Sequence, residues 1–139
     1  MKLPILKTVL RITLGAFMVY AGILHLTSKR MEFQALVPRW LPDDPSFLDF
    51  VVISSGVVEI GLGLAMIFWT SQKTKTGIAL AVFLILVFFG NLSQYTNGID
   101  AFGLDTDQKR LIRLFFQPIL IVWALWSTDA FNLGKKPQP

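Results

Sequence analysis

The chain has 139 residues, of which 53% are hydrophobic and 16% are charged, and its mean hydropathy is +0.58. A soluble domain normally carries about 25% charged residues, so this composition indicates a membrane protein, and the length suggests one domain. The net charge of +4 does not indicate a nucleic-acid partner, because the basic residues flank apolar runs and form no stripe with aromatics. The lack of cysteine excludes disulfides and thiolate sites, and one histidine argues against a protein-only metal site.

Four apolar segments predict four membrane-spanning helices. They cover about residues 6–26, 47–69, 76–95 and 110–128. Each is close to the ~20 residues that a helix needs to cross the ~30 Å hydrocarbon core. Their continuous apolar character, without alternation, favours helices over barrel strands. We therefore predict an all-α fold, a transmembrane four-helix bundle in which residues 1–139 form a single domain.

The segment between the first two spans predicts one more element. Phe33, Leu36, Val37 and Trp40 fall on one helical stripe of the sequence MEFQALVPRWLP. Two prolines in this segment limit any helix to a short piece. We expect a short interfacial helix after the first crossing, which caps the outer face of the bundle. The alternative is a loop that packs on the bundle through its apolar content.

The basic residues give a weak prediction of orientation. An even number of crossings places both termini on one side, with seven Lys and Arg residues on that side and six on the other. This small excess favours cytoplasmic termini under the positive-inside rule. We expect an integral protein of a prokaryotic cytoplasmic membrane.

Glu59 is the only ionisable residue in the second span after Asp49. A carboxylate at that depth costs a few kcal/mol and normally faces the protein interior with a partner. Each of the other three spans also carries polar residues in its outer half, so the expected polar centre comprises His25, Glu59, Asn91, Gln94, Arg113 and Gln117.

This polar centre has two interpretations. The first is a ligand pocket, in which Glu59 pairs with Arg113 or His25 while Asn91 and Gln117 surround them. The second is a hydrogen-bond network that only holds the helices together. Under the second interpretation, His25 and Arg113 are interfacial anchors, and Asn91 is a helix cap, as is Gln94.

Four glycines share helical stripes with these polar residues. Gly15 and Gly22 lie on the face of His25, and Gly56 and Gly63 on the face of Glu59. Small residues let helices approach closely in lipid, so we expect all four glycines to pack helices. They predict either a homodimer or close packing within the chain.

The same residues resemble the DoxX-like family of small four-helix membrane proteins. The resemblance covers most of the chain, and its most specific part is the segment from Ile53 to Gly63, which contains Gly56 and Glu59. Other parts of the pattern are Arg11, Gly15, Ala21, Gly22 and His25, then the segments 33–38 and 41–42, Asn91, and the segment from Ile112 to Gln117. Many relatives have proline and alanine before the asparagine, and RLPLQ in the fourth helix, where this chain has Phe89-Gly90 and RLFFQ.

The resemblance implies the fold more strongly than the activity. The family name comes from a subunit linked to a thiosulfate–quinone oxidoreductase, and other relatives look like maturation or assembly factors for membrane proteins.

We therefore carry three functional hypotheses for the chain. The first is a protein that binds a small molecule or lipid, or that helps a membrane-protein client to assemble. The second is a quinone-binding subunit of an oxidoreductase, which needs an electron-carrying partner because the chain has no redox centre of its own. The third is a small transporter or channel. No residue is a candidate for catalysis, and the chain is expected not to be an enzyme on its own.

Overall fold

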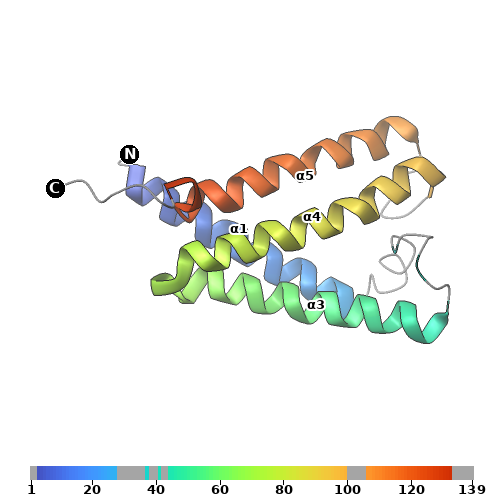
Figure 1. Ribbon diagram of the computed structural model, residues 1–139, viewed down its shortest axis with the longest axis horizontal. Helices are drawn as coiled ribbons and strands as arrows, with labels where there is room; N and C mark the ends of the chain where they lie inside the picture. The colour runs from blue at the N-terminus through green and yellow to red at the C-terminus, as the bar shows by residue number, and fades with distance from the viewer. Residues whose placement is uncertain (1–2, 28–36, 38–40, 42–43, 100–105, 133–139) are drawn as a thin grey trace.

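The computed structural model describes residues 3–27, 37, 41, 44–99 and 106–132, and within them it confirms the predicted all-α fold (Figure 1). The four long helices and two short 3-10 turns are α1 (Leu3–Leu26), α3 (Pro45–Phe68), η1 (Thr70–Gln72), α4 (Lys73–Asn97), α5 (Asp107–Ser127) and η2 (Ala130–Asn132). Each of the four long helices is long and apolar enough to cross a membrane, and the span that contains α4 also includes η1. The predicted interfacial helix falls almost entirely outside the described residues.

Local sequence signals explain where the helices begin and end. Pro45 occupies the first turn of α3, where its missing N–H is not needed. Thr106 caps α5 by accepting a hydrogen bond from the backbone N–H of Lys109 at 3.2 Å. Gly98 ends α4 with a φ of 60°, a left-handed conformation that glycine adopts without steric cost.

The helices α1 and α3 form a close pair through the four predicted glycines. A Cβ atom built on Gly15 would lie 2.7 Å from the carbonyl oxygen of Gly63, and one on Gly22 would lie 2.8 Å from that of Gly56. Both distances are too short for any side chain larger than hydrogen. These glycines are therefore used inside the chain, and they give no support to a homodimer.

The helices α4 and α5 form a second pair. Near the start of α4, Gly77 packs so closely on Thr128 that an added Cβ would overlap its hydroxyl group. Further along, Asn91 and Gln117 hydrogen bond across the pair. Because η1 is short, α3 and α4 are antiparallel neighbours, and Figure 1 shows them diverging as they leave η1.

We call the end where α1 begins and α5 finishes the terminal end, and the opposite end the loop end (Figure 1). At the terminal end the two pairs close on an apolar core, which includes Leu14, Met18, Met66, Leu80 and Ala124. All five are almost fully buried. This core packs the two pairs together at the terminal end of the bundle.

Charged residues fasten the terminal end. The Asp129 carboxylate lies 2.8 Å from the Lys7 ammonium and 3.1 Å from that of Lys73, so it joins α1 to the start of α4. Lys7 also lies over the ring of Trp126, 5.1 Å from its centroid. The hydrogen bond from Lys7 holds the pKa of Asp129 below its ordinary value.

The buried guanidinium of Arg11 donates to the carbonyl oxygen of Met66 in α3. Arg11 is only 4% exposed, so its charge is held by a backbone acceptor inside the bundle and does not extend into solvent.

Candidate functional site

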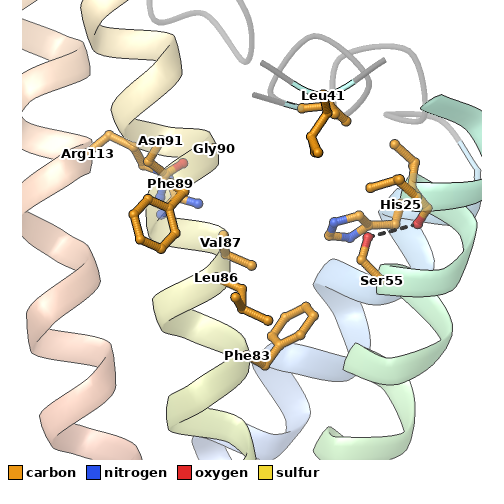
Figure 2. Close-up of a pocket in the computed structure, with 13 residues that line it drawn as sticks. His25, Leu41, Ser55, Phe83, Leu86, Val87, Phe89, Gly90, Asn91 and Arg113 are labelled. Atoms are coloured by element: carbon orange, nitrogen blue, oxygen red, sulfur yellow. Dashed lines mark hydrogen bonds between the residues drawn. The ribbon is translucent and has the colours of Figure 1, made fainter. Parts of the chain in front are cut away.

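A pocket of about 330 Å³ lies between the two helix pairs at the loop end. This volume is at the lower end of the range of about 300–1,000 Å³ that is usual for small-molecule sites. Figure 2 shows His25 and Ser55 on one side, facing Asn91 and Arg113 on the other. The remaining lining residues are Val37, Leu41, Val51, Val52, Phe83, Leu86, Val87, Phe89 and Gly90. The pocket is therefore apolar, with a few polar side chains on opposite walls.

His25 and Glu59 form the polar part of the wall made by α1 and α3. Their facing atoms, His25 Nδ1 and Glu59 Oε2, are 2.8 Å apart, and both side chains are more than nine-tenths buried. His25 Nδ1 also lies 3.0 Å from the carbonyl oxygen of Ala21. Because both neighbours of Nδ1 are acceptors, this nitrogen carries a hydrogen. Glu59 Oε2 is in contact with the ring but has no aligned hydrogen bond within the described part of the chain.

The close approach of α1 and α3 positions this pair. A Cβ on Gly56 would lie 2.7 Å from the Cβ of His25, so His25 sits directly against a glycine of α3. Gly56 precedes Glu59 by three residues, on the same helix face. The glycine contact therefore fixes the distance between the imidazole and the carboxylate.

Asn91 belongs to a hydrogen-bond chain on the opposite wall. The Gln117 amide nitrogen donates to the carbonyl oxygen of Leu84 at 2.8 Å, which turns the Gln117 amide oxygen toward Asn91. Asn91 Nδ2 donates to that oxygen at 3.1 Å. This chain fixes the orientation of the Asn91 amide, since a flipped amide would place two oxygens against each other. Asn91 Oδ1 is left buried, with no hydrogen-bond partner among the described residues.

Arg113 brings a positive charge to the same wall. It reaches the pocket from α5 and is half-buried there. Its charge interacts with that of Glu59 across the bundle. Within the described ranges, no hydrogen bond or ion pair joins its guanidinium to another residue. Glu59 is therefore in contact with His25, while Arg113 is a more distant partner.

The structure brings most of the predicted polar centre together. His25, Asn91 and Arg113 line the pocket, and Glu59 and Gln117 hold His25 and Asn91 from behind. Gln94 lies elsewhere, because its amide donates to the carbonyl oxygen of Ile99 just beyond α4.

That carbonyl also accepts from Arg110 at 3.0 Å, so Gln94 and Arg110 stabilise the end of α4. Asn91, in contrast, lies six residues before the end of the helix at Asn97 and does not act as a cap.

One feature of the site had little signal in the sequence. The apolar lining residues resemble any lipid-facing residues of a span, so only the packing reveals that Phe83 and Val87 face a pocket. The charged contacts of the terminal end did have a signal, because Asp129 is the only acidic residue expected on that side of the membrane. Within the described ranges, no group of three or more potential ligands could hold a metal ion.

These observations define the class as a four-helix membrane-spanning bundle with a partly polar pocket at one end. The chain belongs to the family described as Domain of unknown function (DUF8561), whose match covers residues 14–128 and therefore all the pocket residues. Comparison with curated proteins and with solved structures gave no match.

Proposed function

We propose that this protein binds a small amphipathic molecule in the pocket between α3 and α4. The observation that carries the proposal is the presence, in one apolar pocket, of the Arg113 cation and of Asn91 Oδ1, neither of which has a hydrogen bond or ion pair with a described residue. A buried acceptor without a partner costs about 1–3 kcal/mol, and a desolvated charge costs more. A network that only held the helices together would satisfy these groups internally. A bound molecule that hydrogen bonds to Arg113 and Asn91 would explain why these two groups lack partners among the described residues.

The pocket opens sideways toward lipid. Leu86 lines it and is 63% exposed, and Phe89 beside it is 46% exposed. Phe83 and the apolar core close it toward the terminal end (Figure 2). This arrangement favours a molecule that enters from the bilayer over an ion that crosses the bundle, so we place the transporter hypothesis last.

Native mass spectrometry of the protein in a mild neutral detergent tests the proposal. Ser55 lines the pocket, and its hydroxyl bonds only to its own helix, at Val52, so Ser55→Phe fills the space without breaking a contact between helices. Val57→Phe is the matched control, because it adds the same ring at an exposed position of α3. We expect wild type and Val57→Phe to retain a small molecule that Ser55→Phe loses. Equal retention by all three proteins would contradict the proposal.

A quinone is the second candidate ligand, because His25 and Arg113 approach one apolar slot from opposite walls, as two carbonyl oxygens of a ring would require. In that case an oxidoreductase partner supplies the electrons. The protein is reconstituted with a quinone, and the ultraviolet absorbance of the purified complex is measured. Quinone absorbance that stays with the protein distinguishes a quinone site from a lipid site. The resemblance to the DoxX-like family is compatible with either ligand and with a role in helping a membrane-protein client to assemble.

We also propose that the terminal end faces the cytoplasm of a prokaryotic cell. The start of α1 and the end of α5 lie at the same end of the bundle, as an even number of crossings requires (Figure 1). Lys7 and Lys73 are at this end, in line with the positive-inside rule. Labelling of single cysteines introduced at Thr8 and at Asp107 in intact cells tests the orientation. Labelling of the cysteine at position 8 from outside would overturn it.

A further inference from the structure

We infer that the ligand of this pocket is a single-chain lipid whose headgroup carries an oxyanion with a neighbouring hydroxyl group. The inference rests on the proposed function and names the chemistry of the molecule bound there. It is drawn from the different hydrogen-bonding requirements of Arg113 and Asn91, which lie on one wall of the pocket.

Arg113 requires an acceptor. A guanidinium has five N–H donors and no acceptor, and it binds oxyanions in a bidentate way. This one is half-buried and has no hydrogen bond or ion pair with any described residue. An anionic oxygen on the ligand satisfies it, because the carboxylate of Glu59 is in contact with His25 and not with this guanidinium.

Asn91 requires a donor. Its Nδ2 is committed to Gln117, whose own nitrogen is committed to Leu84, so the free position of the amide is Oδ1 and cannot be exchanged by a flip. Asn91 is only 2% exposed, and its Oδ1 has no partner among the described residues. A purely anionic group such as a carboxylate cannot donate to it. A headgroup with a hydroxyl beside the anionic oxygen satisfies both residues.

The depth of these residues indicates a lipid. Asn91 lies six residues before the end of α4, and Arg113 six residues after the start of α5. At 1.5 Å per residue, both are about 9 Å from the helix ends, so they lie below headgroup depth, within reach of a molecule that enters from the hydrocarbon core. The pocket continues from them toward Phe83 and Leu86, away from the loop end (Figure 2). Its volume of about 330 Å³ suits one hydrocarbon chain better than two.

Four probes separate the parts of this inference. Dodecylphosphoglycerol has the anion, the hydroxyls and the chain, whereas dodecyl methyl phosphate has the same charge and chain but no hydroxyl. 1-O-Dodecylglycerol has the chain and the hydroxyls but no oxyanion. Glycerophosphoglycerol has the headgroup without a chain. Their retention by the full-length protein is measured by native mass spectrometry in a neutral, bulky-headed detergent, with the filled-pocket variant Ser55→Phe as the background.

We expect dodecylphosphoglycerol to bind most tightly. A charged hydrogen bond contributes about 1.5–3 kcal/mol, so its affinity should exceed that of 1-O-dodecylglycerol, which has no oxyanion, about 10- to 100-fold. A neutral hydrogen bond contributes about 0.5–1.5 kcal/mol, so it should exceed dodecyl methyl phosphate about 2- to 10-fold. Glycerophosphoglycerol should show no retention above background.

Two variants assign these preferences to residues. Arg113→Gln should remove the preference for the anionic probes. Lys109→Gln is the control, because it makes the same change of charge at an exposed position one turn away, and it should keep the preference. The double variant Asn91→Leu/Gln117→Leu removes both partners of a buried hydrogen bond, which is nearly neutral for folding. It should lose the preference for hydroxyls and keep that for the anion.

The failures of the two proposals are distinguishable. Equal binding of the three dodecyl probes to wild type, above the Ser55→Phe background, would overturn the headgroup inference and leave the pocket as a binding site. No binding above background would overturn the proposed function as well. Binding of glycerophosphoglycerol as tight as that of its dodecyl counterpart would show a soluble ligand and overturn the lipid.

Discussion

At the terminal end the carboxylate of Asp129 lies between Lys7 and Lys73, and Arg11 donates to a backbone carbonyl, so these charged groups have partners within the chain. At the loop end Arg113 has no ion pair with a described residue, and Asn91 Oδ1 has no hydrogen bond among them. Both ends belong to the same four helices, yet one closes on itself and the other keeps a pocket. The charged contacts of the terminal end account for stability, and the groups left without partners at the loop end are the ones on which the proposed binding function rests.

The largest expected effect comes from removing the carboxylate of Glu59. Glu59→Ala leaves the buried His25 ring without its acidic partner and opens a cavity, so it should lower the free energy of unfolding by about 2–5 kcal/mol. Glu59→Gln should cost less, because the side chain keeps its size and its amide oxygen can still accept from the ring. Unfolding in mixed micelles of neutral detergent and sodium dodecyl sulfate measures both. If both variants fold and bind ligand like wild type, the polar centre has no role.

The second prediction contrasts two arginines, one at each end. Arg11→Gln should lower the free energy of unfolding by about 1.5–3 kcal/mol, because it removes a charged hydrogen bond to Met66. Arg113→Gln should leave the stability of the ligand-free protein unchanged or raise it, because it removes a partly desolvated charge that has no hydrogen bond or ion pair with a described residue. The same unfolding assay compares them. Equal destabilisation by the two variants would mean that Arg113 is also structural.

The third prediction concerns the close packing of α1 against α3, which extends from the terminal end to the loop end. Gly63→Ala should cost about 1–3 kcal/mol, because its new Cβ would lie 2.6 Å from the carbonyl oxygen of Gly15 and force α1 away. Gly61→Ala is the control on the same helix, since no atom lies within 4 Å of its added Cβ. It should be neutral or slightly stabilising, because alanine favours helix. If the two changes have equal effects on thermal unfolding, α1 and α3 do not meet through these glycines.

The smallest effect is expected at Asp129. Its pKa is lowered in the folded protein, mainly by the hydrogen bond from Lys7, so the stabilisation is present above the ordinary carboxyl pKa of about 3.9 and is lost as the pH falls through the lowered value. Because the side chain is about one-third exposed, solvent screening keeps the contribution below about 1 kcal/mol. Asp129→Asn should remove this acid-induced loss.

Asn is the suitable replacement because Asp129 has a φ of 62°, which asparagine tolerates. Thermal unfolding of wild type and Asp129→Asn between pH 3 and pH 7 measures the effect. A variant with the same acid dependence as wild type would show that other carboxylates account for it.

The sequence by itself determined the number, type and approximate limits of the spans, because an uninterrupted apolar run of this length has few alternatives to a membrane helix. It also pointed to Glu59, since a lone carboxylate in such a run requires a partner. Helical spacing placed Gly56 and Gly63 on the face of Glu59, although it could not say whether a second copy or another helix of the chain packs against them.

Only the tertiary structure decided which residues meet. Candidate partners of Glu59 lay on different helices, and the glycine contacts between α1 and α3 place His25 in contact while Arg113 stays farther away. The amide of Gln94 turned out to cap the end of α4, which depends on where the helix stops. The pocket itself depends on how far the two helix pairs diverge, and that distance is a property of packing between elements distant in sequence, which no local pattern encodes.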